Sequence, residues 1–139
     1  IVNMQKNNTK FITISKNISE YSEKILQFYN PHYSKPLDKN SVEKTAIFCL
    51  ALNNSSIIGA LRVISDLSRH ALIVDLLVDK NYRNLRVGSQ LLSNAILELK
   101  KYGLKNVGLV TDPSDPNLKD FYQKNGFKPL KKNQYLEYN

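Results

Sequence analysis

The sequence predicts an α/β fold, a single domain in which a mixed central sheet is flanked by about four helices. Short β-rich runs alternate along the chain with segments whose apolar residues recur at helical spacing. The length of 139 residues suits one domain, expected over residues 1–139, because no linker or internal repeat divides the chain. The content of 42% hydrophobic and 23% charged residues is typical of globular proteins.

One strand and two helices are expected in the N-terminal part. Residues 11–15 alternate and are β-rich, which predicts a strand. Asn17 and Glu20 have the spacing of a capping box, and the apolar residues after them share one helical face as far as Phe28. The Asn-Pro pair at residues 30–31 ends that helix. A second, short helix is expected over residues 38–45.

Three strands are expected next, over residues 46–52, 56–64 and 71–78, and the first two are separated by a hairpin-type turn at residues 53–55. Cys49 is the only cysteine of the chain and lies inside an apolar run. We therefore expect it to be buried and to take part in neither a disulfide nor a metal cluster.

The remaining elements are a long helix, a strand, a short helix and two closing strands, expected over residues 87–102, 106–111, 117–124, 127–130 and 134–138. Gly103 is a natural end for the long helix. The turn-like residues 112–116 precede the short helix and contain side chains that could cap it.

The composition restricts the location and the partners of the protein. The longest apolar run, residues 46–52, is far shorter than the roughly 18 residues that a membrane span needs, so no membrane partner is expected. The N-terminal residues are polar and show no secretory signal, and a reduced, cytoplasmic setting is expected. His32 and His70 match no zinc motif, so no metal is expected.

The formal net charge of +8 indicates an anionic partner, which could be nucleic acid, a membrane surface or a phosphate-bearing ligand. The excess is mostly lysine, in a chain that is also rich in asparagine. Charge alone therefore does not favour a nucleic-acid partner.

The segment that carries chemistry is a basic loop between the strand that ends at Val78 and the long helix. A helix N-terminus presents unpaired N–H groups and a partial positive charge, which favour a phosphate group. Lys80, Arg83 and Arg86 add charge, and Gly88 permits close backbone approach. These features predict a pyrophosphate-binding turn, although a solvated basic surface would have a similar composition. The glycine patterns of dinucleotide and nucleoside-triphosphate sites are absent.

This pattern resembles the signature of the GNAT superfamily of acyl-CoA-dependent N-acyltransferases, in which Gln or Arg is followed after two residues by Gly and then, one residue later, by Gly or Ala. Arg83 matches the first position and Gly88 the last, whereas Arg86 replaces the middle glycine. Arg86 could weaken the backbone approach to the pyrophosphate, or it could supply side-chain charge instead.

A second match lies downstream, where Tyr122 is followed after three residues by Gly126 and Phe127, as in the late helix of the family. Asp115 replaces the asparagine that often stands seven residues before that tyrosine, which affects one expected cofactor contact. The segment from Ile64 through the strand 71–78 is similar to a branch that acetylates small amines. The resemblance covers nearly all of the chain from residue 11 onward.

The resemblance implies acetyl-CoA as cosubstrate and no metal. The pantetheine arm would pair with the backbone of Leu76, Leu77 and Val78. The pyrophosphate would contact backbone N–H groups of the turn, from the residues Arg83, Asn84, Leu85, Arg86, Val87, Gly88 and Ser89.

Tyr122 matches the family position that protonates the departing thiolate, although it could instead be a core aromatic residue. Asp75, an acid in an apolar strand, could accept the amine proton, bind the ammonium group, or have a structural role. The loop at residues 31–36, which contains His32 and Tyr33, occupies a region that often shapes the acceptor site. His32 and His70 are each expected to be solvated rather than to act as bases.

The function expected from these observations is transfer of an acetyl group from acetyl-CoA to a primary amine, on a small molecule or a protein, by direct attack. The alternatives are a non-catalytic acyl-CoA-binding regulator, motivated by Arg86, and a basic nucleic-acid-binding module. Dimers are common in the family, so a homodimer is possible.

Overall fold

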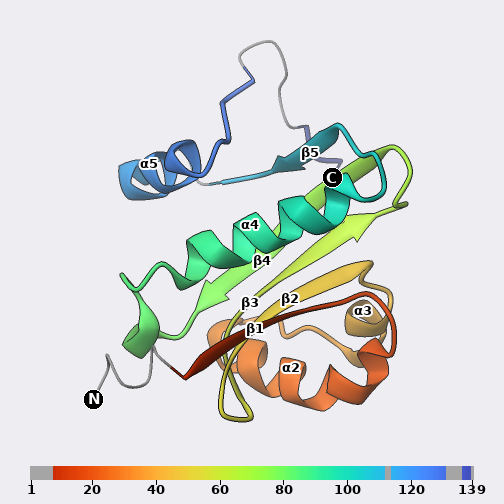
Figure 1. The fold of residues 1–139 in the computed structure, drawn as a ribbon, viewed down its shortest axis with the longest axis vertical. Helices are drawn as coiled ribbons and strands as arrows, with labels where there is room; N and C mark the ends of the chain where they lie inside the picture. The colour runs from red at the N-terminus through yellow and green to blue at the C-terminus, as the bar shows by residue number, and fades with distance from the viewer. Residues whose placement is uncertain (1–7, 112–113, 131–135, 139) are drawn as a thin grey trace.

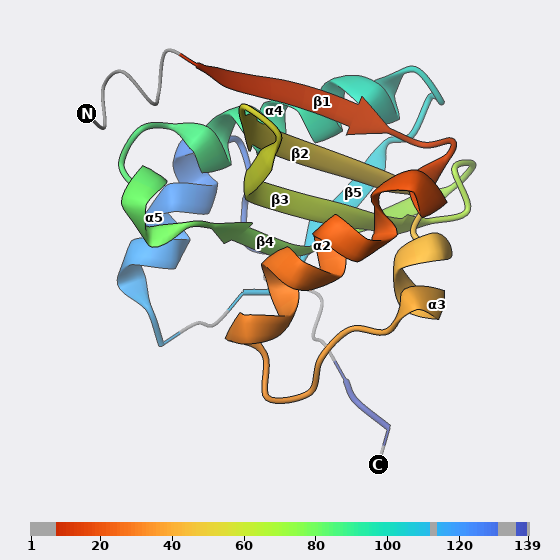
Figure 2. The ribbon, with the colours of Figure 1, turned by 90° about the horizontal axis from the view of Figure 1, so that it is seen from below.

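The computed structural model describes residues 8–111, 114–130 and 136–138. A five-stranded sheet with the order β1-β2-β3-β4-β5 forms its centre (Figures 1 and 2). Neighbouring strands are antiparallel except for β4 and β5, which are parallel. The strands are β1 (Thr9–Ile14), β2 (Ile47–Asn53), β3 (Ser56–Ser65), β4 (His70–Val78) and β5 (Asn106–Leu109).

Helices cover both faces of the sheet. The helices α2 (Ser22–Tyr29) and α3 (Lys39–Glu43) lie on one face, and α4 (Val87–Lys100) and α5 (Pro116–Lys124) lie on the other (Figure 2). Short 3₁₀ turns are η1 (Ile18–Tyr21), η2 (Asn30–His32) and η3 (Lys80–Tyr82). The mixed sheet and the four α-helices of the described residues confirm the predicted fold class.

The core has two halves, one on each face of the sheet, because side chains of a strand point to alternate faces. Ile47 and Cys49 of β2 belong to the half that contains α4, while Phe48 and Leu50 belong to the half that contains α2. Cys49 is fully buried, as predicted, and burial raises the pKa of its thiol to about 11.

Strand β4 has two irregularities that matter for the site. Ala60 faces Leu77 and Arg62 faces Val74, so β4 contains one more residue than β3 between these pairs, which is a β-bulge. The pairing with β5 ends at Ile73, although β4 continues to Val78. Beyond Ile73, the edge of β4 that faces away from β3 therefore has no strand beside it among the described residues.

The structure corrects two expectations. Asn17 does not form a capping box: its φ is 57° and its side chain makes no capping hydrogen bond, because the chain enters a 3₁₀ turn instead of the extended conformation that an N-cap needs. Residues 127–130 form no strand, because no neighbouring strand pairs with them in the described part of the chain. In the other predicted closing strand, residues 136–138 are irregular, and residues 134 and 135 lie outside the described residues.

Candidate active site

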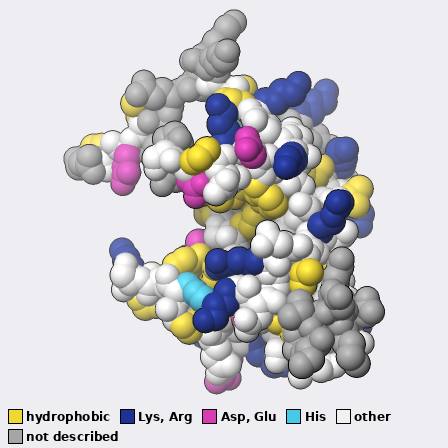
Figure 3. Space-filling model, turned by 90° about the vertical axis from the view of Figure 1, so that its left-hand side faces the viewer, with side chains coloured by type: hydrophobic (Ala, Val, Ile, Leu, Met, Phe, Trp, Pro, Cys, Tyr) yellow, Lys and Arg dark blue, Asp and Glu magenta, His cyan; other side chains and the backbone are white. Residues whose placement is uncertain are grey.

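A cleft opens on the side of the molecule where β4 and β5 separate. Figure 3 shows this hollow face, with hydrophobic side chains at its floor and charged side chains on both sides. Leu76, Leu77 and Val78 of β4 are half-buried and follow the last residue that pairs with β5. An edge of this kind offers backbone N–H and C=O groups to an extended ligand.

The turn before α4 has an unusual backbone. Asn84 and Arg86 both have left-handed φ values, 62° and 64°, and Arg86 is the N-cap of α4 without a side-chain capping bond. Turns that include left-handed residues can direct successive N–H groups into an anion-binding concavity. The dipole of the helix adds to this potential at the same place.

The side chains of this turn have separate roles. Arg83 is exposed, and its Nε donates a hydrogen bond to the Val78 carbonyl oxygen at 3.1 Å, which links the turn to the end of β4. Val87 is buried in the core, and half-buried Leu85 packs against it. The two apolar residues thus anchor the turn, while the Arg83 and Arg86 side chains remain at the surface.

Gly88 lies in the first turn of α4 against α5. A Cβ atom at this position would lie 3.1 Å from Cζ of Phe121, closer than ordinary van der Waals contact. Close approach of a ligand to the Gly88 backbone stays a prediction, and the group that lies nearest to this position in the structure is the Phe121 ring. Gly88 therefore allows α5 to pack on the start of α4, next to half-buried Ser89.

Tyr122 is half-buried on α5 and packs against the core half that contains α4. Its ring makes edge-to-face contacts with Phe121 and Phe127, at centroid distances of 5.1 and 6.1 Å. Burial raises the pKa of the Tyr122 phenol above its ordinary value of 10. Within the described residues its hydroxyl has no hydrogen-bond partner.

Asp115 is the N-cap of α5. Its Oδ1 accepts hydrogen bonds from the backbone N–H groups of Asn117, at 2.9 Å, and Leu118, at 3.4 Å. The predicted cap among residues 112–116 is therefore confirmed at Asp115. An asparagine at this position could accept the same hydrogen bonds, because Asp and Asn are both strong N-cap residues.

Asp75 is the bulged residue of β4 and has a φ of 56°. Its Oδ2 accepts a hydrogen bond from Arg62 Nε at 2.7 Å, and its Oδ1 accepts one from the Tyr33 hydroxyl at 2.9 Å. Tyr29 donates to its backbone carbonyl oxygen at 2.7 Å. Both carboxylate oxygens are thus bound by groups of the protein.

Sequence reasoning did not single out Arg62 or Tyr29. A signal was present in the sequence, because Arg62 and Asp75 are opposite charges within neighbouring apolar strands that a short loop connects. A charge inside an apolar run needs a partner, and each of these residues is the natural partner of the other. Tyr29 gave no such signal, since an aromatic residue on an apolar helix face is ordinary.

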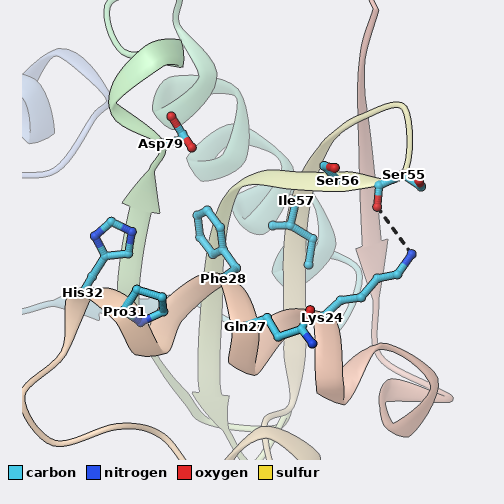
Figure 4. Close-up of a pocket in the computed structure, with 9 residues that line it drawn as sticks. All are labelled: Lys24, Gln27, Phe28, Pro31, His32, Ser55, Ser56, Ile57 and Asp79. Carbon is cyan, nitrogen blue, oxygen red and sulfur yellow. Dashed lines mark hydrogen bonds between the residues drawn. The ribbon is translucent and has the colours of Figure 1, made fainter.

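A pocket of about 490 Å³ lies between α2, the β2–β3 hairpin and the end of β4 (Figure 4). Phe28, Pro31 and Ile57 form its apolar side. Lys24 and Asp79 lie at opposite sides of it, and the Lys24 ammonium donates to the Ser55 carbonyl oxygen at 3.4 Å. The other lining residues are Gln27, His32, Ser55 and Ser56. The pocket thus contains a histidine from the predicted acceptor loop.

No helix in the described ranges is both long and apolar enough to cross a membrane. The same ranges contain no group of three or more His, Cys, Asp or Glu side chains that could hold a metal ion.

The bulged β4, its separation from β5 and the turn before α4 define an acetyltransferase fold. The sequence matches the Acetyltransferase (GNAT) family over residues 15–127, and the chain belongs to this family. No curated protein matches the chain.

Three solved structures share the fold. A GNAT family acetyltransferase of Streptococcus pneumoniae TIGR4 has a TM-score of 0.79 at 20% identity, over 94% of this chain and 98% of that one. A GNAT family acetyltransferase of Staphylococcus aureus Mu50 has a TM-score of 0.66 at 27% identity, over 88% and 87%. An aminoglycoside acetyltransferase from an uncultured soil metagenomic sample, in complex with sisomicin, has a TM-score of 0.69 at 21% identity, over 96% and 97%.

Proposed function

We propose that this protein transfers an acetyl group from acetyl-CoA to a primary amine by direct attack of the amine on the thioester. The single observation that supports this most is the unpaired edge of β4 next to the donor-rich turn before α4. An extended pantetheine arm that ends in a pyrophosphate matches this combination in shape and in charge.

In this proposal the pantetheine arm pairs with the backbone of Leu76, Leu77 and Val78. The pyrophosphate lies at the N–H groups of residues 83–89, with Arg83 and Arg86 as charged neighbours. Arg86 keeps the left-handed conformation that the family's middle glycine adopts easily, so the turn retains its shape despite the substitution. This reduces the case for a non-catalytic regulator, which depended on a damaged turn.

The reaction forms a C–N bond and breaks the C–S bond of the thioester. The amine nitrogen gives one proton to solvent water, and the departing CoA thiolate takes one from the Tyr122 phenol. The phenolate then recovers a proton from solvent, so the overall step neither gains nor loses protons. Because burial raises its pKa, the Tyr122 phenol stays protonated through the neutral range. It loses its proton, and can no longer act as a donor, only above pH 10, the ordinary pKa of a phenol. An alkaline decline of turnover that arises from Tyr122 is therefore expected above pH 10.

The amine is proposed to enter from the pocket between α2 and the end of β4. Its volume of about 490 Å³ is that of a small-molecule site. The Asp79 carboxylate and the ring of Phe28 favour a cationic group, and Pro31 and Ile57 favour a hydrocarbon portion. His32 supplies an imidazole ring at the same pocket.

The test is an acetylation assay with pooled amines: diamines, arylalkylamines, aminoglycosides and lysine peptides. Mass spectrometry identifies acetylated product, and thiol release gives the rate. Tyr122→Phe should lower turnover by roughly 10²–10⁴-fold, the usual contribution of general acid catalysis, with little change in CoA affinity or melting temperature. Tyr102→Phe, at an exposed tyrosine, is the matched control and should have normal turnover.

Two results would contradict the proposal. CoA binding in calorimetry without acetylation of any amine would favour the non-catalytic regulator. Undiminished turnover in Tyr122→Phe would leave the reaction in place and remove the role of the phenol.

A further inference from the structure

Thr111, which follows β5, has a hydroxyl group without a partner. Its Oγ1 is the only buried side-chain nitrogen or oxygen atom that lacks a hydrogen bond in the part of the chain that the structure describes. A hydroxyl that is buried without a partner costs free energy, so native proteins contain few of them. The residue as a whole is half-buried, although its oxygen is enclosed. The surroundings of Thr111 indicate which group could be the missing partner.

The register of β4 and β5 places Thr111 at the narrow end of the gap between the two strands. The strands are parallel, and the last residues that pair are Ile73 and Leu109. At the same spacing Thr111 is level with Asp75, directly before residues 76–78 at the end of β4. Beyond this level the strands diverge (Figure 1). Thr111 therefore lies opposite the wide end of the gap, which is next to the turn before α4.

The alternation of side chains along β5 places Thr111 on the side of the sheet that carries α4 and α5. Val107 and Leu109 pack against the core half that contains α4, whereas Val110 is 60% exposed. Because side chains alternate along an extended chain, Thr111 is the next residue on the face of Val107 and Leu109. Tyr122 packs against the same half of the core. The unpaired hydroxyl is thus on the same side of the sheet as the proposed proton donor.

The proposed binding mode determines which part of acetyl-CoA reaches Thr111. The pyrophosphate lies at the turn before α4, and this turn follows the end of β4, so the pantetheine arm runs back along the strand from Val78 toward Leu76. Its thioester end is therefore at the narrow end of the gap. An acetyl thioester has one strong hydrogen-bond acceptor, the carbonyl oxygen, and no donor. The Thr111 hydroxyl can donate, and no group of the described residues uses this donor.

We propose that Thr111 recognises the acetyl group of acetyl-CoA, because its hydroxyl donates a hydrogen bond to the thioester carbonyl oxygen. This inference rests on the proposed function. Rotation about the Cα–Cβ bond moves the oxygen from its enclosed position to another staggered position, on the exposed part of the side chain. The hydroxyl then has in the complex the partner that it lacks in the free protein. Free CoA ends in a thiol and has no carbonyl oxygen at this place, so Thr111 favours the cosubstrate over the product.

Two substitutions separate the hydroxyl from the rest of the side chain. Thr111→Val keeps the shape and removes the hydroxyl, so it should raise the melting temperature of the free protein, which loses an unpaired buried group. It should also weaken acetyl-CoA binding about two- to tenfold, the usual effect of one neutral hydrogen bond, and leave CoA binding unchanged. Thr111→Ser keeps the hydroxyl and loses the methyl group. It should retain the parent's ratio of acetyl-CoA affinity to CoA affinity and have a lower melting temperature.

Calorimetry with acetyl-CoA and with CoA, and thermal unfolding without ligand, give these quantities for the parent protein and each variant. Thr13→Val is the matched control, because Thr13 lies on β1 at the opposite edge of the sheet from β5. Its half-buried hydroxyl also has a partner, Cys49 Sγ at 3.9 Å. This variant should leave the ratio of the two affinities unchanged and should not raise the melting temperature.

The outcomes distinguish this inference from the proposed function. If the parent protein binds neither acetyl-CoA nor CoA, the proposed function fails and this inference fails with it. If both bind, and Thr111→Val changes their affinities by the same factor or not at all, only the contact with the acetyl group is overturned. A lower melting temperature in Thr111→Val would show that the hydroxyl has a partner inside the free protein, which overturns the contact as well.

Discussion

Arg86 has a backbone conformation that glycine adopts more easily than any residue with a side chain. Its φ of 64° and ψ of 18° lie in the left-handed region, and its side chain makes no capping bond that would offset the strain. Left-handed conformation costs a residue with a Cβ atom about 1–2 kcal/mol. Asn84 has a similar φ of 62°, but asparagine tolerates this region much better.

Arg86→Gly should therefore stabilise the protein by about 1 kcal/mol, since the relief of strain exceeds the extra entropy of glycine in the unfolded chain. CoA affinity should stay within about tenfold, or roughly 1.4 kcal/mol, because one surface charge is lost. Urea unfolding and calorimetry measure the two effects.

Arg86→Ala is the matched control, because it removes the same charge and keeps the left-handed strain. It should show the affinity change of Arg86→Gly without the gain in stability. Equal stabilities for the two variants would refute the strain argument. A much tighter CoA complex in the glycine variant alone would mean that Arg86 obstructs the site.

At the level of helices and strands, most of the fold could be predicted from the sequence. Local patterns sufficed where a strand or helix is defined by its own residues, as for β2, β4 and α4, whose bounds agree with the expected ones to within about two residues. They failed for residues 127–130, because a strand also needs a partner, and β5 ends at Leu109.

The candidate site was predictable in part. The turn before α4 follows from local charge and glycine content, so Arg83, Arg86 and Gly88 could be named from the sequence. The bulge could not, because it depends on the register between β3 and β4, and nothing in a strand's own residues sets the residue at which an extra one is inserted. The contacts of Asp75 with Tyr29 and Tyr33 depend on that register as well.

Helix α5 carries Tyr122 and packs on α4 at Gly88, so its stability should matter to the site. Asp115→Ala removes the N-cap and should destabilise the protein by about 1 kcal/mol. Asp115→Asn preserves the cap and restores the residue that is common in the family, and it should be neutral to within about 0.5 kcal/mol. Thermal and urea unfolding of both variants provide the comparison; equal losses would mean that the charge matters and the cap does not.

The charge of the whole molecule is the remaining property that bears on function. The chain has 20 Lys and Arg residues against 12 acids, for a formal net charge of +8. Of the described residues, Lys39, Arg62 and Lys101 are in ion pairs with carboxylates. Many cationic groups are therefore available to raise the positive potential around a polyanionic ligand.

We expect this potential to act on the phosphates of CoA and not on its pantetheine arm. The affinity for CoA should fall several-fold between about 0.05 and 0.5 M salt, because screening shortens the range of the interaction from about 14 Å to about 4 Å. Pantetheine, which has the arm without the phosphates, is the matched control and should bind more weakly with an affinity that hardly depends on salt. Calorimetry over a salt series gives the dependence of each affinity on salt concentration. An equal dependence for CoA and pantetheine would show that the positive charge does not act on the phosphates. A duplex DNA titrated in the same series tests the nucleic-acid alternative. Because non-specific DNA binding weakens steeply with salt, DNA binding that persists near physiological salt and exceeds the binding of CoA would favour a nucleic-acid-binding module.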